Sequence, residues 1–167
     1  MKKSRLLLMS SLLVLASNFC GCDSDSDSGI RVRNFANTGC KPAETRSEGR
    51  LQDKYGPEYI EYKGMEDGYL SVKHVNAMFN CYPGELRMEA TISGNEISII
   101  EENHHDTDNY ISAACECPYD LYCEVGPLTT SQYSIVVYRK SYQLIEHARF
   151  GISYAKSLNG EYTIGGQ

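Results

Sequence analysis

The cysteines are the residues of this chain with the clearest chemistry. Seven occur among 167 residues, and two of them lie in the first 22 positions. The other five are Cys40, Cys81, Cys115, Cys117 and Cys123. An odd number of cysteines cannot all pair within one chain, so at least one thiol is left over. Disulfides are the expected state of the rest if the protein is exported to an oxidising compartment.

The positions of these cysteines favour one set of pairs without fixing it. Cys115 and Cys117 have the same parity on a predicted strand, so each is expected to bond a different partner. Cys40 and Cys81 lie in separate upstream segments and are the natural partners, although the sequence leaves open which bonds which. Cys123 is then predicted to be a buried free thiol that packs as a small apolar residue.

Metal binding is a second chemistry to consider in the same region. His104, His105 and Asp106 precede Cys115–Cys117 by about ten residues. Structural zinc sites usually place at least two residues between paired cysteines, and only one separates these two. The polar stretch 101–109 is typical of a solvated hairpin loop. We therefore predict no metal site.

The sequence supports a catalytic site no better than it supports a metal site. A nucleophilic cysteine needs a histidine close in space, and nothing in the sequence ties His74 or His147 to Cys123. No nucleophile elbow, phosphate-binding glycine loop or zinc-protease helix motif is present. The acidic residues of the polar stretch match no calcium-loop spacing; they are Glu101, Glu102, Asp106 and Asp108. We predict no catalytic residue and no cofactor, with a small hydrolase using Cys123 or this acidic loop as an alternative.

The N-terminus indicates export. Three basic residues, at positions 2, 3 and 5, precede the uncharged apolar run Leu6–Ala16. That run is too short to span a bilayer, which needs about 20 apolar residues, and it fits a secretory signal. We assign residues 1–21 to a lipoprotein signal peptide. An ordinary secretory signal that is cut elsewhere is the alternative.

Cys22 is the predicted lipidation site. It follows Gly21, the small residue expected before an acylated cysteine, whereas Cys20 follows the bulky Phe19. Residues 23–28 alternate Asp and Ser and are too polar to fold. We assign residues 22–35 to the lipidated cysteine and a flexible acidic tether. More than one acyl chain would anchor the protein stably to the membrane.

Composition limits the partners. The formal net charge of −6, with Lys and Arg scattered, gives no electrostatic footprint for nucleic acid. About 130 residues remain beyond the tether, which suits a single domain over residues 36–167. The 13 tyrosines are compatible with strands and with binding surfaces.

Alternation of apolar and polar residues predicts the elements that position these groups. Residues 85–92 and 96–101 alternate around a turn at Ser93–Asn95, and residues 133–137 alternate again. No stretch after the signal sustains a helical stripe over three turns. Eight or so short strands predict an all-β fold: a two-sheet antiparallel β-sandwich, immunoglobulin-like or fibronectin-like, stabilised by disulfides.

Three local features refine this prediction. Pro118 interrupts an alternating run and argues for a bend or an edge rather than a straight central strand. Leu144, Ala148, Phe150 and Ile152 mark one or two further strands. The segment 126–137 resembles the tyrosine corner of immunoglobulin-like sandwiches, so Tyr133 is expected to bond back to the preceding loop.

Several segments resemble a family of small exported lipoproteins of Bacteroidetes. They are Gly39–Lys41, Asn76–Cys81, Cys115–Leu121 and Val125–Leu128, and the resemblance extends over residues 36–140. The acidic residues after Cys22 also resemble the signal that directs such lipoproteins to the outer leaflet of the outer membrane. The resemblance implies that address and a β-sandwich, and no reaction. Many relatives have a second cysteine where this chain has Tyr82, so no disulfide scheme is transferred.

The sequence therefore predicts a non-enzymatic lipoprotein at the outer membrane, facing the cell surface. Its partners would be the membrane, through the lipid anchor, and a glycan or an envelope protein. The alternative is an inhibitor or immunity-like protein that blocks an enzyme or toxin through an exposed loop. The oligomeric state is not indicated.

Overall fold

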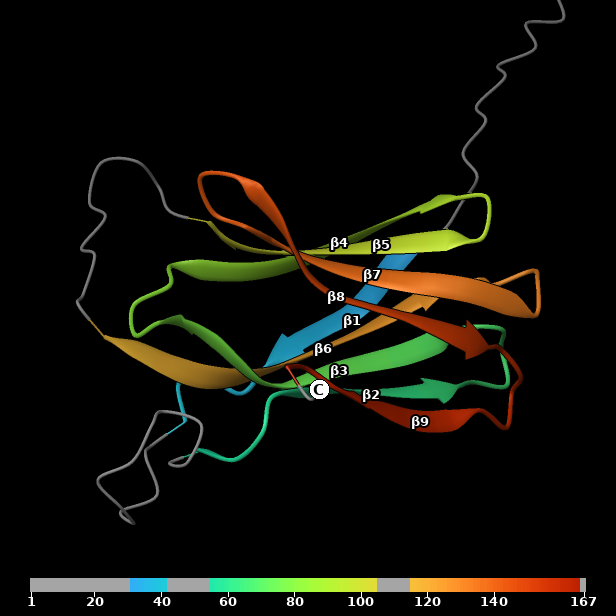
Figure 1. The fold of residues 1–167 in the computed structure, drawn as a ribbon, viewed down its shortest axis with the longest axis horizontal. Helices are drawn as coiled ribbons and strands as arrows, with labels where there is room; N and C mark the ends of the chain where they lie inside the picture. The colour runs from blue at the N-terminus through green and yellow to red at the C-terminus, as the bar shows by residue number, and fades with distance from the viewer. Residues whose placement is uncertain (1–30, 42–54, 105–114, 166–167) are drawn as a thin grey trace, which may run out of the picture.

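The protein is a β-sandwich in a computed structural model that describes residues 31–41, 55–104 and 115–165. Two sheets lie face to face in Figure 1. One has the strand order β1-β6-β3-β2-β9: β1 (Arg31–Asn37), β6 (Glu116–Gly126), β3 (Leu70–Asn80), β2 (Tyr59–Gly64) and β9 (Asn159–Thr163). The other has the order β4-β5-β7-β8: β4 (Glu85–Ser93), β5 (Glu96–His104), β7 (Gln132–Lys140) and β8 (Leu144–Ser153). The all-β, two-sheet prediction is confirmed.

The core lies between the sheets and follows from the two-residue alternation. In β3 and β5 the inward positions hold Leu70, Val72, Ile97 and Ile99, each no more than 1% exposed. Each such side chain contributes about 1.5–3 kcal/mol when it is fully buried. This alternation also determines which polar residues of the same strands must point inward.

One strand pair differs from the predicted antiparallel arrangement. β5 and β7 are parallel, with Ile97 opposite Ile135 and Glu101 opposite Arg139. A parallel pair needs a crossover connection, and here β6 of the other sheet lies between the two strands in sequence. The remaining pairs described are antiparallel.

β6 corrects the interpretation of Pro118. The strand runs through the proline without a break and lies between β1 and β3. β1 pairs with β6 from Gly126 back to Leu121, which lies opposite Asn37. β1 ends before it reaches Pro118, although the backbone N–H of Lys41 still donates to the carbonyl of Pro118 at 2.9 Å. The proline thus occupies a central strand at a place where one neighbour is no longer a regular strand.

The folded domain begins earlier than predicted. β1 starts at Arg31, opposite Gly126 of β6, so residues 31–35 belong to the sandwich and not to the tether. Cys22 and the remainder of the proposed tether lie outside the described residues. Within the described part of the chain there is no helix long and apolar enough to cross a membrane.

The tyrosine corner is present. The hydroxyl of Tyr133 accepts hydrogen bonds from the backbone N–H groups of Thr129 (2.9 Å) and Thr130 (3.0 Å). Tyr133 is 3% exposed. Its role is structural, because these bonds fix the loop through which the chain passes from β6 to β7.

Candidate functional site

The inward face of the sandwich changes from apolar to charged at one end. In three strands, two apolar inward residues are followed by a polar one on the same face: Leu70, Val72 and His74 in β3; Ile97, Ile99 and Glu101 in β5; and Ile135, Val137 and Arg139 in β7. Glu58, just before β2, and His147 of β8 complete the group. We call these five residues, Glu58, His74, Glu101, Arg139 and His147, the interior polar cluster.

His74 lies at its centre. The side chains of His74 and Glu101 are each 1% exposed. The Nδ1 atom of His74 lies 2.7 Å from Oε1 of Glu101, and its Nε2 atom lies 3.0 Å from Oε1 of Glu58. One imidazole therefore bridges two carboxylates, one from each sheet's side of the core.

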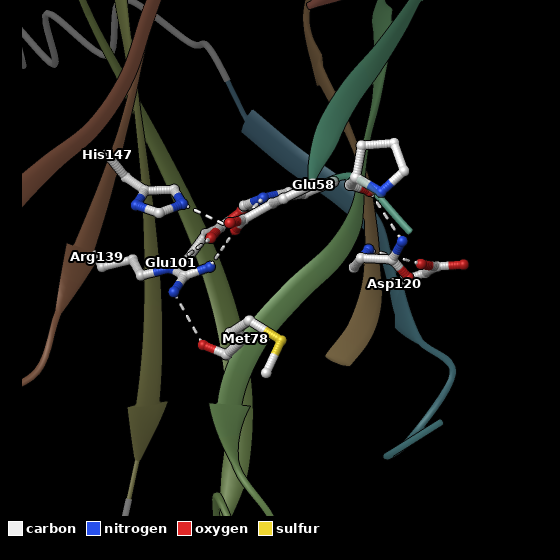
Figure 2. A network of polar contacts seen from close by, with 9 residues as sticks. Glu58, Met78, Glu101, Asp120, Arg139 and His147 are labelled. Atoms are coloured by element: carbon white, nitrogen blue, oxygen red, sulfur yellow. Dashed lines mark hydrogen bonds and ion pairs between the residues drawn. The ribbon is translucent and has the colours of Figure 1, made fainter. Parts of the chain in front are cut away.

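The same oxygen of Glu58 meets two further nitrogens. Nε2 of His147 lies 2.8 Å from Glu58 Oε1, and Nη2 of Arg139 donates to that oxygen at 2.6 Å. Nη1 of Arg139 donates to the carbonyl of Met78 at 2.9 Å. Figure 2 shows His147 and Arg139 pointing toward Glu58.

Hydrogen bonds and opposite charges within the cluster offset the cost of burying its charged groups. Burial opposes protonation of His74, but the charge of Glu101 and the hydrogen bonds to Glu101 and Glu58 outweigh it and raise the pKa of His74 to about 9. Burial likewise opposes ionisation of Glu58, yet the hydrogen bonds from His147 and His74 and the charge of Arg139 hold the pKa of Glu58 well below its usual range. At neutral pH His74 is thus charged, and both of its ring nitrogens donate.

A β-bulge places His147, and a second bulge follows His74. The register of β3 on β6 shifts between His74 and Ala77. The register of β7 on β8 shifts at Val137 and Tyr138, whose partners, Ala148 and Glu146, leave His147 opposite no residue. Bulges bend a strand and redirect a side chain, which explains how His147 reaches Glu58 although Ala148 holds the regular inward position.

A second set of contacts positions Glu58. Asn76, in the bulge of β3, has a φ of 60°. Its Nδ2 group donates to the carbonyls of Tyr55 (2.8 Å) and Pro57 (2.9 Å). Its Oδ1 accepts from Nζ of Lys41 at 2.9 Å, and Lys41 also pairs with Asp120. Asn76 therefore fastens the segment that leads into Glu58 to the sheet.

Two atoms of the cluster have no hydrogen-bond partner. Oε2 of Glu101 and Nε of Arg139 are both buried and unpaired. They lie 4.0 Å apart, too far for a hydrogen bond. Unsatisfied buried polar atoms are uncommon and call for an explanation.

The cysteines behave as the sequence analysis expected. Cys40 bonds Cys117, and Cys81 bonds Cys115. The reason lies in the neighbours of β6: the N–H of Cys81 donates to the carbonyl of Cys115 on the β3 side, whereas Lys41 bonds Pro118 on the other side. Cys123 is free and buried.

Cys123 is not arranged as a nucleophile. Burial, aided by the charges of Glu101 and Glu124, raises the pKa of Cys123 to about 12. A thiol that stays protonated at neutral pH is a poor nucleophile. The histidines that the sequence offered as partners, His74 and His147, instead bond carboxylates.

The polar stretch at the end of β5 is only partly a loop. Glu101 was predicted to lie in a solvated hairpin, and this is wrong: the strand continues to His104, and Glu101 is buried. Glu102 pairs with Lys140 at 2.7 Å, and His104 is exposed. His105, Asp106 and Asp108 lie outside the described residues.

A different kind of site lies at the tip of the β7–β8 hairpin. Tyr142 is 99% exposed, Leu144 52% and Ile145 57%. We call these three residues the apolar tip. Leu144 lies in a strand as predicted, β8, but unlike Ala148 and Phe150 it is exposed, as is the next residue, Ile145.

Comparison with known protein families, with curated proteins and with solved structures found no match.

Proposed function

We propose that the protein is a lipid-anchored binding module of the cell envelope that contacts a protein partner through the apolar tip. Cys22 would carry the lipid, and the acidic residues that follow it would hold the sandwich off an outer-membrane surface. The module performs no reaction of its own in this proposal. It belongs with the small exported lipoproteins of Bacteroidetes that the sequence resembles.

The observation that carries the proposal is the exposure of the apolar tip. Four large apolar side chains are exposed among the described residues, and three of them are Tyr142, Leu144 and Ile145. Single exposed apolar residues are ordinary, but here three of them lie within four positions of one hairpin. Tyrosine is enriched at the centres of protein interfaces.

The position of the tip supports the same proposal. β1 enters the sheet at Arg31, at the end of the sandwich where Asn95 of the β4–β5 turn bonds Ser134 at the start of β7. The β7–β8 tip lies at the opposite end (Figure 1). A tether that leads into β1 would therefore turn the apolar tip away from the membrane.

The base of the hairpin is held firmly. Arg139 of β7 and His147 of β8 both bond Glu58, and Lys140 pairs with Glu102. A contact element on a rigid base loses little conformational entropy on binding. The interior polar cluster would thus present the tip in a fixed orientation.

The test is affinity capture from the native host's solubilised envelope, with the full chain in detergent micelles as bait. We expect one envelope or secreted protein to be retained by the wild type and lost from the double variant Tyr142→Ala, Ile145→Ala. Tyr82→Ala is the matched control, because Tyr82 is 67% exposed but lies outside the hairpin. Equal retention by the wild type and the double variant would contradict the proposal. Loss of surface labelling in Cys22→Ala would test the anchor separately.

The inhibitor alternative uses the same hairpin. A narrow apolar tip can enter the cleft of an enzyme or toxin, and co-purification of a stoichiometric enzyme whose activity the wild type blocks would favour it. The glycan alternative uses a different surface: a polar groove of about 410 Å³ across β9, β2, β3 and β6. Its lining includes Glu61, Lys73, Tyr122 and Asn159, and such groups can bond sugar hydroxyls. Binding to a glycan array that persists in the tip double variant would support this second candidate.

A further inference from the structure

Two histidines and a carboxylate converge in the interior polar cluster. Nε2 of His74 and Nε2 of His147 lie 3.0 and 2.8 Å from the same oxygen, Oε1 of Glu58. The ligand-type atoms of these three residues all lie within 4.8 Å of one another. None of these three residues belongs to the apolar tip, and none is among the histidines and cysteines that the sequence suggested for metal binding, His104, His105, Cys115 and Cys117.

We propose that Glu58, His74 and His147 form a binding site for one divalent transition-metal ion of the Zn²⁺ class. Two imidazole nitrogens and one carboxylate oxygen are a donor set that zinc accepts, with a fourth position left for water. On binding, the ion takes the hydrogen-bonding positions between the two Nε2 atoms and Glu58. A protonated imidazole releases its Nε2 proton to solvent and a neutral one carries its single proton on Nδ1, so no oxidation or reduction is involved.

The two nitrogen-to-carboxylate distances are already close to those of such a site. Zinc binds imidazole nitrogen at about 2.0–2.1 Å and carboxylate oxygen at about 2.0–2.2 Å, so the ligand atoms of a tetrahedral site lie roughly 3.3 Å apart. The present separations of 3.0 and 2.8 Å need to widen by only a few tenths of an ångström. The two imidazole rings already lie close, with centroids 5.7 Å apart.

The partner of His74 supports the assignment independently. A histidine that binds a metal through one nitrogen usually donates its other N–H to a carboxylate or carbonyl, which fixes the orientation of the ring. Nδ1 of His74 lies 2.7 Å from Oε1 of Glu101, and both side chains are 1% exposed. Nε2 of His74 is thereby directed at Glu58.

Arg139 is the group that must move, and the cluster contains an acceptor for it. Nη2 of Arg139 now occupies Oε1 of Glu58, where the ion would bind. Nε of the same arginine and Oε2 of Glu101 are buried, unpaired and 4.0 Å apart. A shift of Arg139 toward Glu101 would clear Glu58 and pair both orphaned atoms, which accounts for two unsatisfied groups in one cluster.

The ion would join the two sheets. Glu58 directly precedes β2 and His74 lies in β3, both of the five-stranded sheet, whereas His147 belongs to β8 of the other sheet. His74 is enclosed, whereas the His147 side chain is 22% exposed and the Glu58 side chain 13%. Entry of the ion is therefore expected from the side of His147.

The experiment titrates Zn²⁺ alone into the chelator-stripped full chain in detergent micelles, followed by isothermal calorimetry and by Co²⁺ substitution. We expect one ion per chain and a Co²⁺ spectrum without a thiolate charge-transfer band. His147→Ala should weaken binding by about 100-fold or more. Glu101→Gln, which weakens the support of His74 and the acceptor for the displaced Arg139, should weaken it by about 10–100-fold. His104→Ala is the matched control, because His104 is exposed and outside the cluster, and it should bind like the wild type.

Two results would overturn the proposal. One is the absence of Zn²⁺ binding by the folded wild type at about 1 mM ion; the other is equal binding by His147→Ala and the wild type. If His147→Ala does not fold, as judged by near-ultraviolet circular dichroism, X-ray absorption of the zinc-loaded wild type decides. Two imidazoles with oxygen donors support the site, and any sulfur ligand or any other number of imidazoles contradicts it.

Discussion

The interior polar cluster and the apolar tip depart from the usual distribution of residues in opposite ways. In the cluster, charged side chains lie in the core, and all but two of their buried polar atoms are paired. At the tip, large apolar side chains lie in solvent. Buried polar groups and exposed apolar patches are the informative exceptions in a folded protein. The buried polar groups of the cluster are largely paired within the chain. The exposed apolar side chains of the tip are the ones that we propose to bind a partner.

The two regions are neighbours on the same two strands. Arg139 and His147 belong to the cluster and lie at the base of the hairpin that carries Tyr142. We therefore expect different roles for the two regions. The cluster stabilises the sandwich and holds the hairpin in place, and the tip binds a partner protein. Substitutions in the cluster should change stability, and substitutions at the tip should change binding alone.

The largest effect is expected from Glu101→Ala. It leaves His74 charged and buried without its closest partner, and removing one member of a buried ion pair typically costs about 3–5 kcal/mol. Glu102→Ala is the control, since Glu102 pairs with a Lys140 side chain that is 53% exposed, and exposed pairs contribute about 0–1 kcal/mol. Urea denaturation measures both. Equal losses of unfolding free energy in the two variants would show that the buried ion pair of the cluster contributes no more than an exposed surface pair.

The pH dependence of stability should report the same pairing. The pKa of His74 is raised from 6.5 to about 9 on folding, so its contribution is fully present below about pH 6.5 and is lost as the pH rises through about 9. Metal-free wild type should therefore lose stability to urea over that interval. His74→Gln should lose this part of the slope. A wild-type stability that stays level or rises between pH 6.5 and 9 would contradict the assignment of charge to His74.

Much of this arrangement follows from the sequence, and part of it does not. Alternation predicts the strands and their inward faces, and continued by one step it reaches His74, Glu101 and Arg139, so the cluster was detectable in principle. His147 was not, because a bulge sets its direction and the alternation places Ala148 there instead.

Exposure at the tip and the contact between distant elements depend on tertiary structure. The alternation groups Leu144 with Ala148 in one strand and does not show that Leu144 is exposed. Glu58 precedes β2 and contacts Arg139, 81 residues away, and only the strand order brings them together. The parallel pairing of β5 with β7 also depends on the strand order, which the sequence does not show.

A smaller loss is expected from Asn76→Ala. The substitution removes two hydrogen bonds to the segment before Glu58, from Nδ2 to the carbonyls of Tyr55 and Pro57, and places alanine at a φ of 60°. Each lost hydrogen bond typically costs about 0.5–1.5 kcal/mol. Asn95→Ala, at an exposed turn position, should change the free energy of unfolding by no more than about 0.5 kcal/mol. A loss in Asn95→Ala as large as in Asn76→Ala would show that the clamp on Glu58 has no special role.

The smallest effect on stability is expected at the tip. Tyr142→Ser combined with Ile145→Ser should leave the free energy of unfolding within about 0.5 kcal/mol of the wild type, because both side chains are exposed. Thermal and urea unfolding measure this. A loss above about 2 kcal/mol would mean that the tip packs within the protein and is not held out for a partner.

Photo-cross-linking in the native envelope would show whether the apolar tip contacts a partner. A photoreactive amino acid is placed at Tyr142 in one chain and at Asn95, in the turn at the opposite end of the sandwich, in another. We expect one discrete protein adduct with the photoreactive residue at position 142 and no such adduct with it at position 95. No protein adduct from position 142, or the same adduct from both positions, would contradict it.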